Sequence, residues 1–261
     1  MKLRGDESLI DIHAHILPLV DDGAKSAIES LSLCETALKN SIEAIVATPH
    51  FNKYEEIKKK SQLRDERISE LQTYLDTNKC PISIYPGFEV YCGEEIAQVT
   101  DFSDFTINKS RYMLCEFDFF EPDALVFMQI IDHIVKCGVV PIIAHPERYK
   151  AFLEDYESLN YIRRWGALYQ LNAGSFTGAY GRGERRLAIT MLQCGFCDFI
   201  ATDAHSIHSR STNLKEMLID SQIDFASGEL DIMTVHNPRR ILENEEITDI
   251  KRGFITYDAL D

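Results

Sequence analysis

The stretch Asp11-Ile12-His13-Ala14-His15 ends an apolar run that begins at Leu9. Such a run predicts a β-strand, in which side chains two residues apart point to the same face. We therefore expect His13 and His15 to direct their imidazoles to one point in space. A His-x-His pair on its own is more often structural than metal-binding, so its meaning depends on the residues that accompany it in the rest of the chain.

Four later segments place a histidine or a carboxylate at the end of an apolar, β-prone run. They are Thr48-Pro49-His50, Gly87-Phe88-Glu89, Ala144-His145-Pro146-Glu147-Arg148 and Thr202-Asp203-Ala204-His205. Glu116 lies inside another apolar run, where a buried carboxylate requires a compensating charge such as a metal ion. Asp21-Asp22-Gly23 is compatible with a simple turn. In combination these segments indicate a site for several metal ions, because His and carboxylate ligands suit Zn, Mn, Fe or Mg.

Seven apolar runs alternate with longer segments of helical periodicity, and no repeat or linker interrupts them. The candidate strands are 9–16, 44–48, 82–90, 112–117, 139–144, 167–171 and 196–202. Strand–helix alternation along one chain is typical of a parallel α/β fold. In α/β barrels the carboxyl ends of the strands surround one mouth, and six of the candidate strands carry candidate ligands there. Residues 1–261 are expected to form a single domain, since barrels of this kind commonly have about this size.

The composition narrows the classes of partner. The formal net charge is −15, which disfavours binding to nucleic acid.

The N-terminus lacks the apolar segment of a signal peptide, and no apolar run reaches the roughly 18–20 residues that span a bilayer, so we expect no membrane insertion. Seven scattered cysteines, an odd number, do not form a disulfide framework, and a cytoplasmic location is expected. The oligomeric state stays open.

Two arginines follow candidate ligands closely in the sequence. Arg148 comes three residues after His145, and Arg210 comes five residues after His205. Both would reach over the same mouth, and the planar guanidinium fork binds phosphate through two hydrogen bonds. An ion pair at the rim of the barrel is an equal alternative.

A second group of arginines, Arg182, Arg185 and Arg186, opens a helical pattern and is expected to form a solvated face. The glycines at 174, 178, 181 and 183 predict a flexible loop before that helix. They do not form a phosphate-binding loop of the G-x-x-x-x-G-K type.

The chain offers no obvious nucleophile for covalent catalysis. No cysteine is followed six residues later by arginine, and no G-x-S-x-G motif is present. Cys194 and Cys197 form a single C-x-x-C pair across a helix end, and both thiols are expected to fill the core.

Taken together, the motifs quoted above resemble the polymerase-and-histidinol-phosphatase (PHP) superfamily. Within it, the chain is most similar to the bacterial manganese-dependent protein-tyrosine phosphatases of capsule and exopolysaccharide control (CpsB/YwqE type). The resemblance extends from about residue 9 to the segment 237–242, and the order and spacing of the motifs make it specific. The loop between His205 and Arg210, which contains His208, departs from the family pattern.

The resemblance implies a distorted seven-stranded α/β barrel, (β/α)7, with three divalent metal ions. Mn²⁺ is the expected metal, with Fe, Zn or Mg as alternatives. One metal would be held by His13, His15, Glu89 and Asp203, a second by Glu89, Glu116 and His145, and a third by Asp22, His50 and His205. Arg148 and Arg210 match the phosphate-binding arginines of the family. The implied partner is the phosphorylated tyrosine-rich tail of a bacterial tyrosine kinase.

The hypothesis from the sequence is hydrolysis of phosphotyrosine by a metal-activated hydroxide, with the metals and two arginines stabilising charge on the phosphate. Asp203 or His205 could protonate the tyrosyl oxygen. Histidinol-phosphate phosphatase, or another small-molecule phosphoesterase, is the alternative enzyme. A nuclease is disfavoured by the acidic charge, and an amidohydrolase by the lack of a strand lysine. The non-enzyme alternative is a metal-binding scaffold without catalysis.

Overall fold

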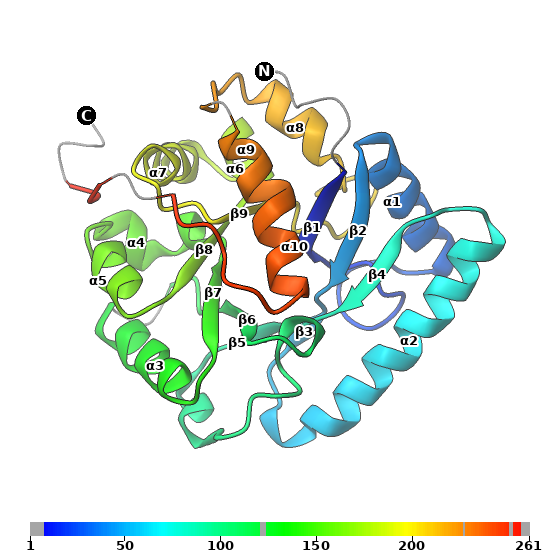
Figure 1. The fold of residues 1–261 in the computed structure, drawn as a ribbon, viewed down its shortest axis with the longest axis horizontal. Coiled ribbons are helices and arrows are strands. Elements are labelled where there is room, and N and C mark those ends of the chain that lie inside the picture. The colour runs from blue at the N-terminus through cyan, green and yellow to red at the C-terminus, as the bar shows by residue number, and fades with distance from the viewer. Residues whose placement is uncertain (1–7, 121–123, 227, 251–252, 257–261) are drawn as a thin grey trace.

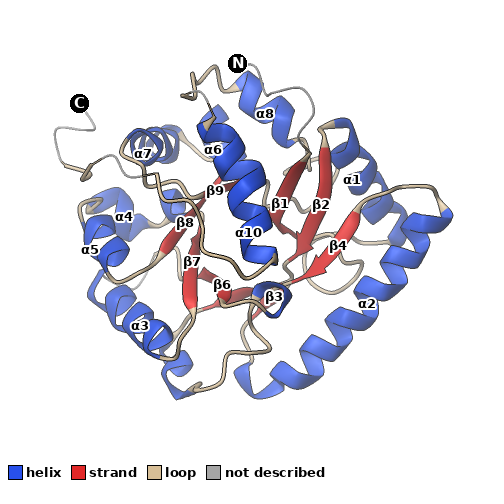
Figure 2. Ribbon diagram, in the orientation of Figure 1, coloured by secondary structure: helices blue, strands red, loops and turns tan. Residues whose placement is uncertain are grey.

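The computed structural model describes residues 8–120, 124–226, 228–250 and 253–256. Parallel strands line the centre of the molecule, and helices pack around them (Figures 1 and 2). The strands are β1 Leu9–Ala14, β2 Ile42–Ala47, β3 His50–Phe51, β4 Ser83–Pro86, β5 Glu89–Tyr91, β6 Tyr112–Glu116, β7 Val140–Ala144, β8 Leu168–Asn172 and β9 Phe199–Ala201. They form two sheets, in the orders β1-β2-β4 and β3-β5-β6-β7-β8-β9. Every pair within these sheets is parallel, as the alternation of strands and helices predicts.

The described residues form nine strand segments, whereas the sequence predicted seven strands. β2 is separated from β3 by Thr48 and Pro49, and β4 from β5 by Gly87 and Phe88. β2 pairs with β4, whereas β3 pairs with β5, so one wall of the barrel is interrupted at the same level in two neighbouring strands. Pro49 has no N–H to donate to a ladder, which explains the break in the first strand. At Gly87 a Cβ would lie 2.7 Å from Cγ1 of Val46. The backbone between β4 and β5 therefore passes close to β2, and glycine leaves the space that this approach requires.

The last strand returns to the first. The amide of Asp203 donates to the carbonyl of His13 at 2.9 Å, and the amide of His15 donates to the carbonyl of Ala204 at 2.8 Å. Ala14 and Ala204 form an isolated parallel bridge. The fold is therefore an α/β barrel of distorted shape, in which the residues after β9 lie beside the end of β1.

The helices follow the strands in alternation. They are α1 Ala27–Lys39, α2 Ile57–Thr77, α3 Ala124–Lys136, α4 Lys150–Glu154, α5 Ser158–Arg164, α6 Ala173–Thr177, α7 Arg182–Gln193, α8 Leu214–Asp220, α9 Glu229–Asp231 and α10 Asn237–Leu242. Short 3₁₀ turns lie at Tyr54–Glu56, Glu94–Gln98, Ile107–Lys109 and Pro146–Arg148 (η4), and a π-turn at Ile232–His236 leads into α10. Across the described part of the chain, no helix is long and apolar enough to cross a membrane.

The segment around the four glycines is not a flexible loop. Gly174 lies inside α6 and Gly183 inside α7, so two of the four positions are helical. Arg185 is not simply solvated, because its Nε donates to the carbonyl of Phe176 at 2.9 Å. The short helix α6 was hidden in the sequence because glycine-rich composition normally indicates a turn.

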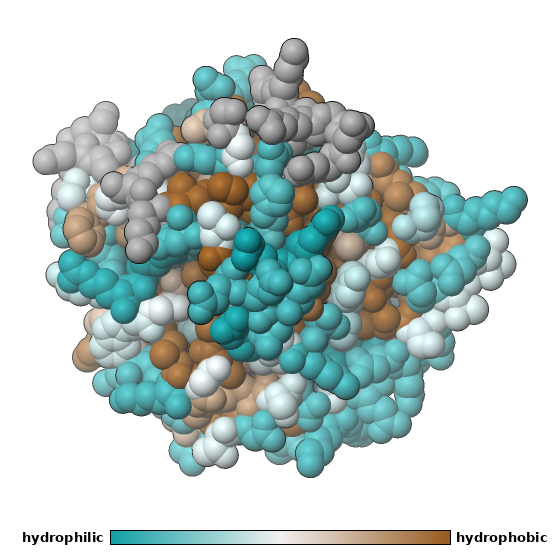
Figure 3. Space-filling model, in the orientation of Figure 1, coloured by the Kyte–Doolittle hydropathy of each residue, from teal (hydrophilic) through white to brown (hydrophobic). Residues whose placement is uncertain are grey.

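Two apolar clusters hold the barrel together. The larger one fills the space between the strands and the outer helices. The smaller one combines side chains of β1, β2, β6, β7 and β9 with Ile241 of α10. Because α10 also pairs Arg239 with Glu43 near the start of β2, it lies at the amino ends of the strands. This end faces the viewer in Figure 1, and its centre is hydrophilic in Figure 3.

Candidate metal centre

The end of the barrel opposite α10 brings together the side chains that were singled out as ligands. His13 is the penultimate residue of β1 and His15 follows the strand. Asp22 lies in the next loop, and His50 and Glu89 begin the short strands β3 and β5. Glu116 ends β6, His145 follows β7, and Asp203 and His205 follow β9. Strand breaks thus place His50 and Glu89 level with the carboxyl ends of the other strands, as the register His50–Glu89 shows.

Glu89 lies at the centre of the group and is 1% exposed. Its Oε2 is 3.1 Å from Nε2 of His13, Nε2 of His15 and Nδ1 of His50. Its Oε1 is 2.8 Å from Nε2 of His145. Although three imidazole nitrogens surround Oε2, none of the described residues forms a hydrogen bond of acceptable geometry with it. One carboxylate oxygen facing several nitrogens without pairing with any is the arrangement expected where donor atoms converge on cations.

Among the residues that the structure describes, three sets of donor atoms lie close enough to hold a metal ion. They are His13, His15, Glu89 and Asp203; His50, Glu89 and Glu116; and His15, Asp22, His50 and His205, with the atoms of each set within 4.8 Å of one another. The first set has the same members as the first expected ligand set. The second contains His50, while the expected ligand His145 lies 3.9 Å from Oε1 of Glu116. The third contains the three expected residues together with His15.

The donor chemistry fits divalent cations. The Nε2 atoms of His13 and His15 face each other at 3.2 Å, and Nε2 of His205 is buried without a hydrogen bond to any described residue. Two neutral imidazole nitrogens at this distance each point a lone pair to the same place, which a cation or a proton must satisfy. None of the three sets contains a cysteine, so the site offers the nitrogen and oxygen ligands of borderline and hard metals.

Without a cation, protons carry the positive charge of the cluster. Burial lowers the pKa of His15, but the hydrogen bond that its ring donates to Asp21 and the negative charge of Glu89 outweigh burial and raise the pKa to about 10. Burial raises the pKa of Glu89, but the neighbouring His13 reverses this and holds the pKa well below its usual range. For His205, burial and the nearby His15 lower the pKa to about 4. Metal binding must therefore displace protons from this cluster.

Polar residues behind the cluster orient its members, and the sequence had not identified them. Oδ2 of Asp21 lies 2.7 Å from Nδ1 of His15, Oε1 of Gln170 lies 2.7 Å from Nδ1 of His13, and Nδ2 of Asn172 donates to Oδ2 of Asp203 at 2.9 Å. Hydrogen bonds of this kind fix the ring orientation of metal-binding histidines. The sequence does carry a signal for two of these residues. Gln170 and Asn172 are polar, lie two residues apart at the end of an apolar strand, and therefore point to the same face.

Several residues of the cluster adopt left-handed backbone conformations that favour glycine. The φ angles are 35° at His145, 52° at Asp203 and 49° at Arg210. Such conformations in non-glycine residues cost on the order of 1–3 kcal/mol each and concentrate at functional sites. The surrounding structure therefore stabilises these three backbone conformations despite their conformational strain.

The two arginines meet beside the cluster. Nη1 of Arg148 and Nη1 of Arg210 both donate to Oδ2 of Asp203, at 3.1 and 3.0 Å. The guanidinium of Arg148 lies between two aromatic rings, 4.8 Å from that of Phe119 and 4.4 Å from that of Tyr180. Both arginine side chains remain partly exposed, so the rest of each fork faces the mouth. Each arginine can therefore pair with Asp203 through one N–H group and bind phosphate through others.

The remaining histidines lie outside the cluster. Nε2 of His133 bonds to the carbonyl of Val99 at 2.8 Å. His208 and His236 are exposed, and neither belongs to the three donor sets. All seven cysteines are free, and Cys197 is fully buried while Cys194 is half-buried.

Histidines, carboxylates and arginines converge at the mouth of an α/β barrel. This combination places the protein in the class of metal-binding α/β barrels. The chain belongs to the CpsB/CapC family of capsular polysaccharide synthesis, whose model matches residues 9–243. It is 34% identical to CapC of Staphylococcus aureus over 243 residues, which cover 92% of this chain and 93% of the relative. It is 30% identical to the tyrosine-protein phosphatase YwqE of Bacillus subtilis, over 92% of this chain and 93% of the relative.

Solved structures share the fold. One belongs to a study of YwqE from Bacillus subtilis and CpsB from Streptococcus pneumoniae, described as unique metal-dependent tyrosine phosphatases. It superposes with a TM-score of 0.84 at 27% identity, covering 95% of this chain and 100% of that chain. The phosphotriesterase homology protein of Escherichia coli has a TM-score of 0.57 at 12% identity, covers 90% of this chain and 99% of that one, and shows likeness of fold alone.

Proposed function

We propose that this protein is a metal-dependent protein-tyrosine phosphatase, which hydrolyses phosphotyrosine to tyrosine and phosphate. The observation that carries the proposal is the convergence of four imidazoles on the carboxylate of Glu89, beside two arginines that share one oxygen of Asp203. Positive and metal-binding groups at one mouth suit a phosphate monoester. The similarity to YwqE and to the CpsB relatives, which are named as tyrosine-protein phosphatases, supports the choice of substrate.

The proposal assigns three divalent metal ions, with Mn²⁺ first among them, to the nine clustered residues. His13, His15, Glu89 and Asp203 would hold one ion, Glu89, Glu116 and His145 a second, and Asp22, His50 and His205 a third. Two of the donor sets support the first and third assignments. The second is supported by Nε2 of His145, which lies 2.8 Å from Oε1 of Glu89 and 3.9 Å from Oε1 of Glu116. Residues 1–261 are treated as one catalytic domain.

When bound, divalent cations supply an activated water at neutral pH and neutralise charge on the phosphoryl group. Arg148 and Arg210 bind the non-bridging oxygens of the phosphate, because each guanidinium has further N–H groups beyond the one that contacts Asp203. Asp203 orients both arginines, and the aromatic rings on either side of Arg148 restrict its motion. Asp203 and His205 were the expected proton donors, but as metal ligands they carry no proton to deliver. We propose that the tyrosyl oxygen leaves as phenolate and takes its proton from solvent.

For the physiological substrate, we propose the phosphorylated tail of a bacterial tyrosine kinase, in the cytoplasm. The family description, capsular polysaccharide synthesis, and the phosphatase names of the relatives support this choice. The free state of all seven cysteines agrees with a reducing compartment.

The test compares three phosphate esters with metal-loaded protein. We expect phosphate release from a phosphotyrosyl peptide with a kcat/KM at least about tenfold above that for a phosphoseryl peptide of the same sequence and for histidinol phosphate. Equal or faster turnover of histidinol phosphate would replace the proposal with a small-molecule phosphatase. Bound metal without turnover of any ester would indicate a scaffold.

A further inference from the structure

Exposed apolar side chains lie on loops at the mouth of the barrel. Among the described residues, the two most exposed large apolar side chains are Phe120 and Leu19, at 81% and 77%. Phe120 belongs to the loop that follows Glu116, and Leu19 to the loop that follows His15. Both loops therefore begin at a proposed metal ligand.

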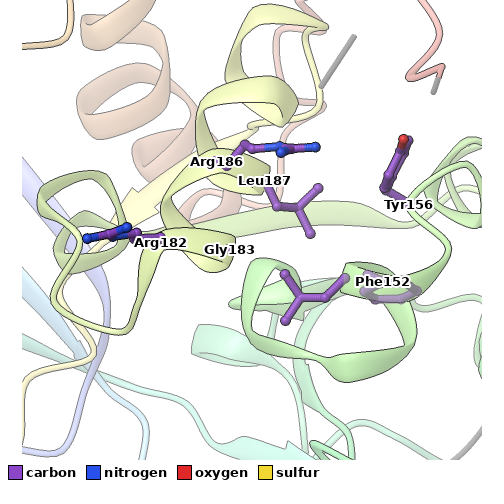
Figure 4. A pocket seen from close by; sticks show the side chains of 7 residues that line it. Phe152, Tyr156, Arg182, Gly183, Arg186 and Leu187 are labelled. Carbon is purple, nitrogen blue, oxygen red and sulfur yellow. The ribbon is translucent and has the colours of Figure 1, made fainter. Parts of the chain in front are cut away.

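The pocket between α4 and α7 shows a more usual arrangement of apolar side chains at a surface. It has a volume of about 250 Å³, and its lining includes Phe152, Leu187, Arg182 and Arg186 (Figure 4). Phe152 and Leu187 are at most 2% exposed, whereas the two arginines are exposed. The large apolar side chains of the mouth lack such burial, which is a feature of surfaces that bind a partner.

The loop of Leu19 has a fixed backbone that presents the leucine to solvent. The amide of Leu19 donates to the carbonyl of Ala24 at 2.9 Å, and the amide of Ala24 donates to the carbonyl of His15 at 3.0 Å. Leu19 has a φ of 61°, a left-handed conformation that leucine rarely adopts. Strained conformations of this kind concentrate at functional sites, which points to a role for this leucine.

A second apolar side chain lies on the neighbouring loop. Ile207 is 41% exposed, and its loop is closed by the amide of His205, which donates to the carbonyl of Arg210 at 2.8 Å. Nε2 of His205 lies 3.4 Å from Oδ1 of Asp22, so this loop contacts the loop of Leu19. Leu19 and Ile207 thus form a first apolar edge of the mouth, after β1 and β9.

Phe119 and Phe120 form a second apolar edge, after β6. The ring of Phe119 is partly exposed and stacks on that of His145, with centroids 5.5 Å apart and 17° between the planes. Around the barrel, β7 and β8 separate β6 from β9, while the β2–β3 and β4–β5 segments separate β6 from β1. The two apolar edges therefore flank the mouth on opposite sides.

The proposed phosphate-binding arginines lie between the two edges. The guanidinium of Arg148 is 4.8 Å from the ring of Phe119, and Arg210 closes the loop of Ile207. Both arginines donate to the same oxygen of Asp203. A single phosphorylated residue held by the arginines leaves both edges uncovered, whereas a longer chain that crosses the mouth covers them.

We propose that the mouth binds an extended polypeptide with apolar side chains on both sides of its phosphorylated residue. This inference rests on the proposed function, because the phosphorylated residue must occupy the metal cluster. The apolar flanks would pack on Leu19 and Ile207 at one edge and on Phe119 and Phe120 at the other. The formal net charge of −15 disfavours acidic flanks and also opposes docking on an anionic membrane.

The test uses phosphotyrosyl peptides of equal length that differ only about two positions before and after the phosphotyrosine, a reach of roughly 7 Å on each side. One peptide has leucine at both positions, one has serine at both, and two have leucine on a single side. We expect the metal-loaded protein to hydrolyse the peptide with two leucines with a kcat/KM at least about fivefold above that with two serines, through a lower KM. The peptides with one leucine should lie between them.

The double variant Leu19→Asn/Phe120→Ser removes one apolar side chain from each edge. Asparagine tolerates the left-handed backbone of Leu19, so the loop keeps its shape. The preference for two leucines should fall below about twofold, through a higher KM for that peptide. Turnover of p-nitrophenyl phosphate, which has no flanking residues, should be unchanged and reports that the variant is folded.

The double variant Tyr161→Ser/Phe254→Ser is the matched control. These rings are 54% and 61% exposed and lie 5.8 and 5.0 Å from the guanidinium of Arg164. Phe254 shares a pocket with Gly195, which precedes β9, so these rings lie toward the amino ends of the strands. This variant should keep the full preference for two leucines.

The outcomes separate this inference from the proposed function. Hydrolysis of phosphotyrosyl peptides without a preference for leucine, or a preference that survives in Leu19→Asn/Phe120→Ser, would overturn the inference and leave the proposed function standing. An oligomer in light scattering that the double variant converts to a monomer would assign the edges to a second copy of this chain. Cosedimentation of the wild type, but not of the variant, with phosphatidylcholine–phosphatidylglycerol vesicles would assign them to a membrane. Either result would overturn the inference, and failure to hydrolyse any phosphotyrosyl peptide would overturn both.

Discussion

Oδ2 of Asp21 lies 2.7 Å from Nδ1 of His15, and the same oxygen accepts the backbone N–H of His50 at 3.1 Å. Asp21 thereby fixes the ring of His15 so that its Nε2 faces Glu89. The aspartate itself belongs to none of the three donor sets among the described residues. It is a positioning residue, whereas its neighbour Asp22 is a proposed ligand.

Replacing Asp21 should weaken metal binding without removing a ligand. We expect Asp21→Ala to lower the affinity for Mn²⁺ about 10- to 100-fold, as is typical for loss of the hydrogen bond behind a ligating histidine. Calorimetric titration of stripped protein measures the affinity. Asp220→Ala, at the exposed end of α8, serves as the control. An unchanged affinity in Asp21→Ala would show that the contact does not orient the ligand.

Glu89 should be the most sensitive position of the cluster. Because it lies between the proposed metals, Glu89→Gln should cost at least two bound ions and reduce turnover by more than about a thousandfold. Elemental analysis of the purified variant gives the metal content. Full metal content together with the wild-type rate would make the ligand assignment wrong.

Arg148 and Arg210 should act on the phosphate rather than on the metals. Arg148→Lys keeps the charge but loses the planar fork, so we expect kcat/KM for a phosphotyrosyl peptide to fall about tenfold or more, equivalent to ~1.4 kcal/mol, with unchanged metal content. Product inhibition by inorganic phosphate should weaken in parallel. A variant that loses metal instead would place Arg148 in support of the cluster.

Stability of the metal-stripped protein should depend on pH in the alkaline range. The pKa of His15 is raised from 6.5 to about 10 in the folded chain, so its stabilising contribution is complete below pH 6.5 and is lost as the pH rises to 10. The pKa values of His13 and His50 are raised in the same direction by the carboxylates around them. We therefore expect the Tm of stripped protein to fall between pH 6.5 and 10.

The variant His15→Gln isolates this effect from the general titration of lysines and tyrosines. In stripped form it should show a shallower fall of Tm over the same range. An equal slope in the variant and in the wild type would contradict the assignment of the alkaline loss to His15.

The sequence was sufficient for the strands and for the residues of the cluster, because both depend on local patterns. His13 and His15 share a face by the two-residue repeat of a strand, and the observed 3.2 Å between their Nε2 atoms confirms it. Each of the seven candidate runs contains a strand in the structure. The break at Pro49 was also readable from the residue type, but the extra strand β3 depends on its pairing with β5.

Other features depend on contacts between distant segments and could not be read from local pattern. Gln170 contacts His13 across 157 residues, and Asn172 contacts Asp203 from a neighbouring strand. His50 approaches Glu116 at 3.4 Å, which places it in a second donor set in addition to the expected one with Asp22 and His205. The pocket at Arg182 and Arg186 arises from the packing of α7 on α4, so a cluster interpreted as a solvated face forms one wall of a cavity.

Hydrolysis of phosphotyrosine should require the metals bound in the cluster, and a reconstitution experiment measures this dependence. Phosphate release from a phosphotyrosyl peptide is followed with chelator-stripped protein, before and after addition of Mn²⁺. We expect negligible release from stripped protein and recovery of turnover that rises with bound Mn²⁺. Equal release before and after addition, or no release at full metal occupancy, would contradict it.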